Sequence, residues 1–366
     1  MGGQMPSDPG AVLVIGPSWV GDMVMAQPLV EMLKRRPETP AVDILAPAWS
    51  APLIHRMPGA RRALEAPFRH GQLGLSARYQ LGSRLRAERY RQAIVLPNSF
   101  KSALVARFAR IPLRTGWRGE WRYPLLNDCR VLADSRHPLM VQRFAALALP
   151  NGEPLPDPLP APRLVADVEG VEEALQVHQL DRDRPVLALC PGAEFGEAKQ
   201  WPAEHHAALA AEKIRDGWQV WLFGSANDRP MADSIENELV PNDIRRCHNL
   251  AGRTSLAQAI DLLSVSDAVV SNDSGLMHVA AALHRPLVAL FGSTSWTFTP
   301  PMTEPVSMLA TDIDCRPCFQ RQCPLGHRHC LVRLSPADVS RHLESVMSGK
   351  NHGAVTLPMM PLPAGA

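Results

Sequence analysis

The sequence predicts an α/β protein with two facing Rossmann-like domains and a cleft between them. Short apolar runs alternate with amphipathic helical patterns, which is typical of parallel sheets covered by helices. A proline-rich segment interrupts this alternation once, after which it starts again. No apolar run approaches the roughly 18 residues that a membrane span requires, so both halves are expected to fold as globular domains.

The N-terminal half begins with residues 1–10, which we expect to be flexible. Residues 11–16 form a continuous apolar run, which predicts a buried strand, and a helical pattern follows over 23–36. Further strands are expected at 42–46 and 93–96. The order of strands and helices indicates βαβ units and therefore a doubly wound parallel sheet.

The segment 151–163 is expected to connect the two domains. Six prolines fall within the thirteen residues 150–162, a composition that favours a stiff, extended connector. It separates an N-terminal domain of residues 11–150 from a C-terminal domain of residues 164–335.

The C-terminal half repeats the alternation of strands and helices. Strands are expected at 186–190, 219–223, 268–271 and 287–291. Helices are expected at about 203–216, 228–239, 255–264 and 275–283. A last helix is expected over 336–350, and residues 351–366 are expected to form a flexible tail.

Composition disfavours an exported, disulfide-stabilised protein. Residues 1–10 contain no positive region followed by an apolar stretch, so we predict no export signal. Seven cysteines are an odd number in a chain of 366 residues, which fits a reducing compartment better than a disulfide scaffold. We therefore expect a cytoplasmic protein.

Positive charge is concentrated in residues 51–143. This segment holds 18 Lys or Arg against five Asp or Glu, although the whole chain has a net charge of only +2. Nearly all these cations are Arg, which suits bidentate contacts with phosphate and carboxylate groups. A solvated basic face, an anionic acceptor and an anionic membrane surface are all compatible with this pattern. No nucleic-acid-binding motif accompanies it, so we predict no nucleic-acid partner.

Ligands of doubly wound sheets bind beyond the carboxyl ends of the strands, and this rule selects the loop 16–22 first. Its glycine spacing is similar to that of a P-loop, but Asp22 occupies the position of the lysine, which disfavours phosphate binding. The dinucleotide pattern G-x-G-x-x-G is also absent. A carboxylate at the end of the first strand is well placed as a general base. The alternative is that Asp22 only caps the following helix.

Two loops of the C-terminal half are selected by the same rule. In the loop 191–201, Gly192 and Gly196 allow close backbone approach, and Lys199 could neutralise a leaving diphosphate. The second loop, Ser271-Asn-Asp-Ser-Gly-Leu-Met-His278, opens directly into a helix, whose first N–H groups attract phosphate. An ordinary capped helix is the alternative for this loop.

Other residues of these loops have candidate roles. Asp273 is placed to accept hydrogen bonds from sugar hydroxyls. His278 lies four residues after Ser274 and therefore on the same helix face. Asp228 follows Phe223-Gly-Ser225 at a helix start, where a carboxylate could bind the two hydroxyls of a ribose.

A cysteine-rich stretch is the remaining motif. Cys315, Cys318, Cys323 and Cys330 have spacing that a structural zinc could use, and reduced cysteines packed in a loop are the alternative. Asp312-x-Asp314 is similar to the D-x-D of metal-dependent sugar transferases. This pair is remote from the three loops, and we assign it no role.

Five blocks in one order resemble glycosyltransferase family 9, the bacterial lipopolysaccharide heptosyltransferases. They are PSWVGDMVMAQP (17–28), PGAEFGEAKQWP (191–202), FGS (223–225), NLAG (249–252) and SNDSGLMH (271–278). The resemblance covers about residues 11–345, and its first and last blocks are the most specific. The enzymes that add the second heptose of the core are the most similar members, and the cysteine-rich stretch is also found in many of them.

The resemblance implies a GT-B fold, with the acceptor on the N-terminal domain, the sugar nucleotide on the C-terminal domain and the helix 336–350 crossing back. It implies inverting transfer of L-glycero-D-manno-heptose from ADP-heptose to the first heptose of heptosyl-Kdo2-lipid A. The family needs no catalytic metal, so no metal and no other cofactor is expected. Peripheral association with the cytoplasmic face of the inner membrane follows from the acceptor and the basic segment.

The same resemblance implies a role for each candidate residue. Asp22 would deprotonate the acceptor hydroxyl, and Lys199 with the N–H groups of Ser274 and Gly275 would stabilise the departing ADP. Asp273 and His278 would bind the heptose or its diphosphate, and Asp228 the ribose. Glu194 and Phe195 correspond to phosphate-contacting positions that carry hydroxyl side chains in related enzymes, so only their backbone contacts are expected here.

Three other interpretations stay open at this point. The first is a heptosyltransferase that adds the first heptose of the core, or one that adds a later heptose, and that therefore uses a different acceptor. An epimerase acting on sugar nucleotides also has two Rossmann domains but needs no acceptor site. A non-catalytic sensor of sugar nucleotides would keep the C-terminal loops and would not need Asp22.

Overall fold

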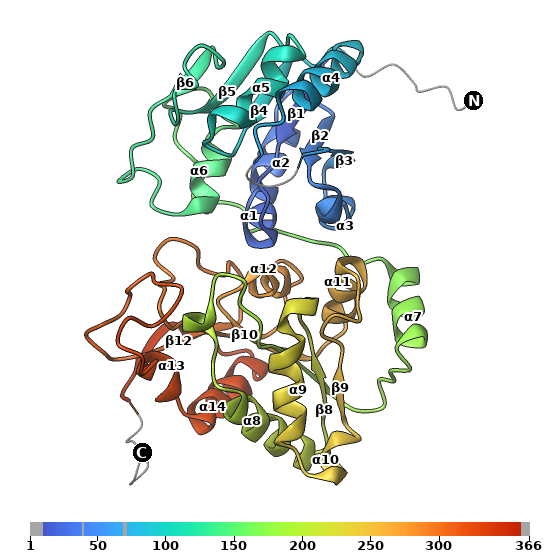
Figure 1. The fold of residues 1–366 in the computed structure, drawn as a ribbon, viewed down its shortest axis with the longest axis vertical. Coiled ribbons are helices and arrows are strands. Elements are labelled where there is room, and N and C mark those ends of the chain that lie inside the picture. The colour runs from blue at the N-terminus through green and yellow to red at the C-terminus, as the bar shows by residue number, and fades with distance from the viewer. Residues whose placement is uncertain (1–9, 39, 69–71, 360–366) are drawn as a thin grey trace. The chain divides into compact units, whose positions relative to one another are not determined.

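The structure is a computed structural model of the chain that describes residues 10–38, 40–68 and 72–359. The expected flexible N-terminus lies almost entirely outside these residues. Two compact units are present, residues 1–165 and 166–366 in extent. Each contains one parallel sheet with helices on its faces, which confirms the predicted pair of Rossmann-like domains (Figure 1).

The N-terminal unit is built on six parallel strands in the order β3-β2-β1-β4-β5-β6. The strands are β1 (Val12–Ile15), β2 (Val42–Ala46), β3 (Ala60–Glu65), β4 (Gln92–Val95), β5 (Leu113–Trp117) and β6 (Asp128–Arg130). The chain direction across the sheet reverses between β1 and β4, which are paired in register from Val12 with Gln92. In doubly wound sheets, ligands bind at the carboxyl ends of the strands that flank such a switch point.

Helices connect these strands. They are α1 (Val20–Met25), α2 (Gln27–Lys34), α3 (Ala51–His55), α4 (Leu75–Leu85), α5 (Phe100–Phe108) and α6 (Met140–Ala146). The single helix expected over 23–36 is in fact α1 and α2, because Pro28 has no N–H to donate to the carbonyl of Val24. The core packs apolar faces of α4 and α5 on β1 and β4.

The proline-rich segment is attached to this unit. The backbone N–H of Arg163 donates to the Gln27 side chain at 3.1 Å, and that of Val165 donates to the Arg56 carbonyl at 2.8 Å. The unit boundary therefore falls after Val165, two residues beyond the expected end of the connector.

The C-terminal unit has seven parallel strands in the order β13-β12-β11-β10-β7-β8-β9. They are β7 (Val186–Cys190), β8 (Gln219–Leu222), β9 (Cys247–Asn249), β10 (Ala268–Asn272), β11 (Leu287–Leu290), β12 (Val306–Thr311) and β13 (Gly353–Leu357). The four strands expected from the sequence are confirmed. The switch point lies between β7 and β10, which pair from Leu187 with Ala268.

The helices of this unit are α7 (Val168–Val177), α8 (Ala203–Arg215), α9 (Arg229–Asn237), α10 (Pro241–Ile244), α11 (Leu256–Ser264), α12 (Gly275–Ala282), α13 (His329–Val332) and α14 (Pro336–Met347). Five of them, α8, α9, α11, α12 and α14, are the helices that the sequence predicts. Helix α14, which we expected to cross back, buries Val339, Leu343 and Val346 in the core of the C-terminal unit.

The expected tail from residue 351 is wrong over Gly353–Leu357. These residues form β13, which pairs with β12 along its whole length. Val355 and Leu357 pack against the core, and the backbone occupies an edge of β12 that would otherwise be unpaired. Residues 360–366 lie outside the described part of the chain.

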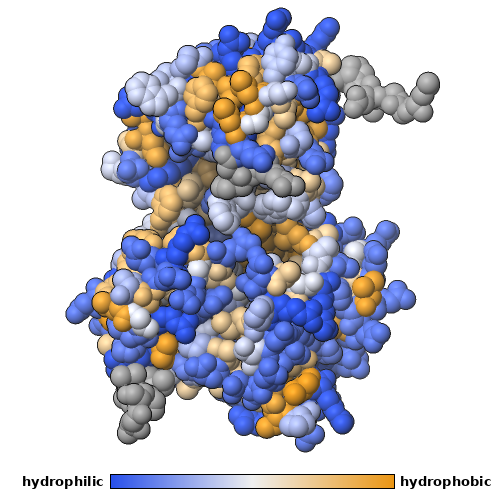
Figure 2. Space-filling view, viewed as in Figure 1, coloured by the Kyte–Doolittle hydropathy of each residue, from blue (hydrophilic) through white to orange (hydrophobic). Residues whose placement is uncertain are grey.

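Figure 2 shows hydrophilic side chains over most of the visible face, interrupted by small separate groups of apolar ones. In the described part of the chain, no helix is long and apolar enough to cross a membrane.

Candidate active site

Asn272, the last residue of β10, ties the loop 191–201 to the switch point. Its side chain is fully buried. The amide nitrogen donates to the Pro191 carbonyl at 2.6 Å, and the amide oxygen accepts from the backbone N–H of Trp201 at 3.3 Å. Both ends of the loop are therefore fixed to one strand. Asn272 was not among the candidate residues predicted from the sequence, although it stands inside the block 271–278.

Lys199 and Asp273 form the central pair of the C-terminal switch point. The Lys199 ammonium lies 2.6 Å from Oδ2 of Asp273, and the Thr294 hydroxyl donates to the same oxygen at 2.6 Å. The two charged side chains are 13% and 6% exposed, so the pair is largely shielded from water. Separate roles were predicted for these two residues, and no role was predicted for Thr294, which follows β11.

Phe195 contributes its ring as well as its backbone. The Lys199 ammonium lies 4.9 Å from the ring centroid, and the Arg321 guanidinium lies 5.3 Å from it. Both distances are within the range of cation–π attraction. The ring thus helps to position Lys199. Only a backbone contact had been expected from Phe195. Glu194, its neighbour, is exposed.

Helix α12 starts directly after this pair. Ser274 occupies the N-cap position, but its side chain makes no capping hydrogen bond. Its hydroxyl instead lies 3.4 Å from that of Ser271. Ser274 is therefore the N-cap by position, as the alternative expected, but its side chain does not cap the helix. The first N–H groups of a helix have no intrahelical acceptor, so a ligand anion can bind them.

His278 lies one turn into α12 and is 6% exposed. Burial is the main cause that lowers the pKa of its imidazole to about 4, although the nearby Asp273 carboxylate acts in the opposite direction. The ring is therefore neutral at pH 7. It can donate or accept a hydrogen bond near the Lys199–Asp273 pair without adding positive charge.

Asp228 lies next to the loop 191–201, at Gly192. Its Oδ2 accepts from both the backbone N–H and the hydroxyl of Ser225 at 2.8 Å, which caps the turn after β8. A Cβ on Gly192 would lie 2.4 Å from the Asp228 carboxyl carbon. This glycine therefore allows the loops after β7 and β8 to touch.

Gly192→Ala is expected to lower the free energy of unfolding by about 1–3 kcal/mol, because the new methyl group overlaps the Asp228 carboxylate. Urea unfolding of the single variants and of Gly192→Ala/Asp228→Ala measures this. The double variant should recover part of the loss, since the second substitution removes the overlap. Simple additivity of the two losses would contradict the contact.

Asp22 lies at the switch point of the N-terminal unit, in the first turn of α1. The N-cap of this helix is Trp19, so the alternative that Asp22 is the N-cap is wrong. Burial raises the pKa of its carboxyl group from 3.8 to about 6. A carboxylate with a pKa in this range can accept a proton near neutral pH and is a better base than an ordinary Asp.

Part of the arginine excess in residues 51–143 is structural. Arg122 is fully buried and donates to the carbonyl of Trp117 and to the Asn98 side chain. Arg130 pairs with Asp128 at 2.7 Å, and Arg78 donates to the carbonyls of Leu73 and Lys101. The exposed cations of this segment include Arg84, Arg89, Arg107, Arg110, Arg118 and Arg136.

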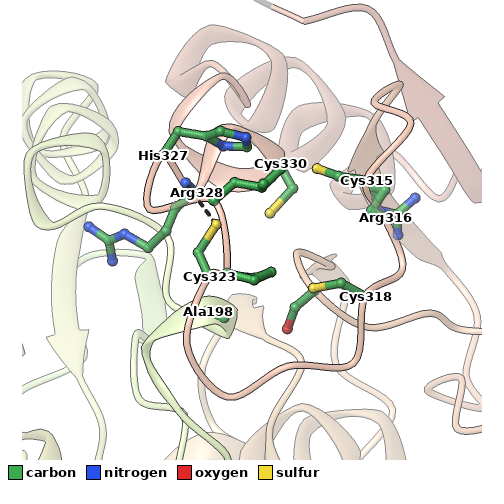
Figure 3. Close-up of a pocket in the computed structure, with 11 residues that line it drawn as sticks. Ala198, Cys315, Arg316, Cys318, Cys323, His327, Arg328 and Cys330 are labelled. Carbon is green, nitrogen blue, oxygen red and sulfur yellow. Dashed lines mark hydrogen bonds between the residues drawn. The ribbon is translucent and has the colours of Figure 1, made fainter.

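The four cysteines of the C-terminal stretch surround one small cavity (Figure 3). All seven cysteines of the chain are free thiols. Burial, and then the neighbouring sulfurs of Cys315, Cys318 and Cys323, raise the pKa of the Cys330 thiol to about 11. This cluster lies beside the loop that carries Lys199, since Ala198 also lines the cavity.

Known proteins are similar to this chain in sequence and in fold. The model of glycosyltransferase family 9 (heptosyltransferase) matches residues 78–329. Lipopolysaccharide heptosyltransferase 2 of Salmonella typhimurium is 47% identical over 92% of this chain and 98% of its own length. Lipopolysaccharide heptosyltransferase 1 of Pseudomonas aeruginosa is 30% identical over 51% of this chain and 55% of its own.

A solved structure extends the likeness to the fold. The structure of Escherichia coli ADP-heptose LPS heptosyltransferase II superimposes with a TM-score of 0.84 and 45% identity, over 92% of this chain and 98% of that one. The family match covers residues 78–329, and the likeness in sequence and fold extends over 92% of the chain. The chain therefore belongs to glycosyltransferase family 9, the heptosyltransferases.

Proposed function

We propose that the chain transfers L-glycero-D-manno-heptose from ADP-heptose to the first heptose of the lipopolysaccharide inner core, with inversion at the anomeric carbon. The observation that carries the proposal is the buried Lys199–Asp273–Thr294 cluster at the carboxyl ends of β7, β10 and β11. The likeness to heptosyltransferase 2 of Salmonella typhimurium covers 92% of the chain, whereas heptosyltransferase 1 of Pseudomonas aeruginosa matches 51% of it. This difference favours the second heptose as the sugar that is added.

The C-terminal unit binds the donor in this account. The ADP diphosphate lies at the start of α12, where the N–H groups of Ser274 and Gly275 and the Lys199 ammonium stabilise its charge. Asp273 and neutral His278 hold hydroxyl groups of the heptose or oxygens of the diphosphate. Asp228 accepts from the ribose with the oxygen that Ser225 leaves free. Backbone groups at Glu194 and Phe195 complete the phosphate contacts.

The reaction is a single displacement. The acceptor hydroxyl oxygen attacks the anomeric carbon while the bond from this carbon to the diphosphate oxygen breaks, and ADP leaves. Asp22 accepts the hydroxyl proton. Asp273 holds the Lys199 ammonium in place, so the positive charge is already positioned when negative charge develops on the leaving diphosphate.

Transfer is tested by the anomeric configuration of the product. Purified protein is incubated with ADP-heptose and heptosyl-Kdo2-lipid A, without added metal, and the product is examined by NMR. A new glycosidic bond with configuration opposite to that of the donor is expected. A rearranged sugar nucleotide formed without acceptor would indicate an epimerase instead, and binding without turnover would indicate a sensor.

Activity should depend on pH through Asp22. Because its pKa is raised to about 6, the carboxylate form is in the majority above this pH and declines about tenfold for each unit below it. The acid limb of kcat/KM is therefore expected near pH 6, and it should be absent from the residual activity of Asp22→Asn. A limb near pH 4 would contradict the raised pKa, and the same limb in the variant would assign it to another group.

We also propose that exposed arginines of the N-terminal unit attract the protein to the cytoplasmic face of the inner membrane. Flotation with anionic vesicles that lack acceptor should recover the chain at low salt and lose it at high salt. Replacing Arg84, Arg107 and Arg110 together by Gln should weaken partition about a hundredfold, at roughly 1 kcal/mol per charge. Gln at the exposed Arg182, Arg215 and Arg245 of the other unit is the matched control. Binding that is absent or insensitive to salt would count against the proposal.

A further inference from the structure

Four cysteine side chains converge on one cavity in the C-terminal unit. Cys315, Cys318, Cys323 and Cys330 line a space of about 20 Å³, enough for one water-sized species. In Figure 3 the four sulfur atoms face the space between these residues. Three of the four precede α13, and Cys330 lies within it.

The groups around the cavity leave sulfur as its main donor atom. The backbone N–H of Arg328 donates to Sγ of Cys323 at 3.4 Å, a contact that favours a thiolate at this position. Nδ1 of His327 already accepts from the N–H of His329 at 3.0 Å. The Arg316 guanidinium donates to the carbonyls of Gly292 and Thr294, at 3.2 and 3.0 Å.

We infer that these four thiolates bind one divalent ion that prefers sulfur and tetrahedral geometry, of the class of Zn²⁺ or Fe²⁺. Four cysteines with two to six residues between neighbours are a donor set for such ions. Four protein ligands leave no open position, so the ion is structural and takes no part in heptose transfer.

Binding requires the loop to contract, because no three of the four sulfurs lie within 4.8 Å of one another in the structure. Metal–sulfur bonds of about 2.3 Å place the four sulfurs about 3.8 Å apart. Residues 314–328 contain no helix or strand, so the loop can close around the ion. A cluster of three carboxylates in the same unit is a weaker candidate for a metal site. Ligand atoms of Glu212, Asp216 and Glu344 lie within 4.8 Å of one another, but the Lys213 ammonium forms an ion pair with all three.

The loop that would hold the ion is bonded to both loops of the donor cluster. The carbonyl of Arg321 accepts from the N–H of Ala198 at 3.1 Å, next to Lys199. The N–H of Phe319 donates to the carbonyl of Ser293 at 2.7 Å, next to Thr294. An ion on the cysteines therefore fixes the backbone that positions Lys199 and Thr294.

Metal content tests the site directly. Protein purified through a tag that binds no metal is analysed by inductively coupled plasma mass spectrometry. About one ion per chain is expected, and the metal measured distinguishes zinc from iron. The double variant Cys315→Ser/Cys318→Ser should lose at least about nine-tenths of it. Cys129→Ser, a half-buried cysteine of the other unit, is the matched control and should retain it. A metal-free wild type, or full content in the double variant, would overturn the inference.

Thiol titration of the wild-type chain keeps the test independent of whether the variants fold. With the ion bound, the four thiols should be unreactive, and a chelator should expose four more thiols per chain. Cys190 and Cys247 are buried and should stay unreactive in both states. Four thiols that react without chelator, or four that are missing even in denaturant because they form disulfides, would overturn the inference.

The supporting role of the ion rests on the proposed function and has its own readout. Metal-free chain should bind ADP about tenfold more weakly than the loaded chain, since loss of a supporting shell typically costs this much. Affinity should return when the metal does. An unchanged ADP affinity would contradict the supporting role. Failure of heptose transfer in the loaded chain would instead contradict the proposed function and leave the metal content as measured.

Discussion

Asp22→Asn is expected to lower kcat for heptose transfer by about 10² to 10⁴, the range that general-base catalysis supplies. Asn has nearly the same shape but cannot accept the acceptor proton. Because Asp22 belongs to the N-terminal unit and the donor cluster to the C-terminal unit, the Kd for ADP should change by less than about twofold. Steady-state kinetics and calorimetry with ADP measure the two quantities.

Glu31→Gln is the matched control for this substitution. Glu31 lies on α2, the next helix, and its carboxylate forms an exposed pair with Arg35 at 3.2 Å. The same change from carboxylate to amide should leave kcat within about twofold, since exposed pairs contribute little. Unchanged turnover in Asp22→Asn would remove the base from the mechanism. Loss of ADP affinity in this variant would show that it disturbs more than proton transfer.

Lys199→Met is expected to lower kcat by about 10² to 10³, because one preorganised positive charge is lost where the leaving diphosphate develops negative charge. Methionine keeps an unbranched apolar stem against the Phe195 ring. The substitution also leaves the buried Asp273 carboxylate with Thr294 as its remaining side-chain donor. We expect the free energy of unfolding to fall by about 3 kcal/mol as a result.

Two further variants separate charge from packing. Arg321→Met removes the other cation from the same ring but has no bond to Asp273, so it should change kcat by less than about threefold. Asp273→Ala should couple strongly with Lys199→Met: the double variant should be less destabilised than the sum of the single ones. Additive losses would contradict the pair, and equal kinetic effects at Lys199 and Arg321 would contradict a specific role for Lys199.

The fold was predictable because its signals are local. Buried parallel strands are continuous apolar runs, and the runs at 11–16 and 268–271 coincide with β1 and β10. The last strand, β13, was not predicted because it is short and lies within residues 351–366, whose composition is typical of a flexible tail. Its pairing with β12 depends on a neighbour about 45 residues away, as with Ser307 and Gly353.

The site was predictable at the level of loops but not of contacts. The topology brings the carboxyl ends of β7 and β10 together. Ligands of parallel sheets bind beyond the carboxyl ends of the strands, and this rule selected Lys199 and Asp273 from the sequence. Their bond joins residues 74 positions apart, which no local pattern encodes. Thr294 was missed for the same reason. The polar residue Asn272 at the end of an apolar strand was a usable signal, since a buried amide needs partners.

Arginine content was a poor guide to surface charge. Arg122 is fully buried and bonded to carbonyl oxygens, yet it counts in the sequence like the exposed Arg118. Only the fold separates structural guanidinium groups from those available to an anionic partner.

Mass spectrometry of the product formed on two acceptors distinguishes transfer to the first heptose from transfer to Kdo. Purified protein and ADP-heptose are mixed with heptosyl-Kdo2-lipid A, and in parallel with Kdo2-lipid A, which lacks the first heptose. We expect a gain of one heptose on heptosyl-Kdo2-lipid A alone. A gain on Kdo2-lipid A alone, or on neither acceptor, would contradict this expectation.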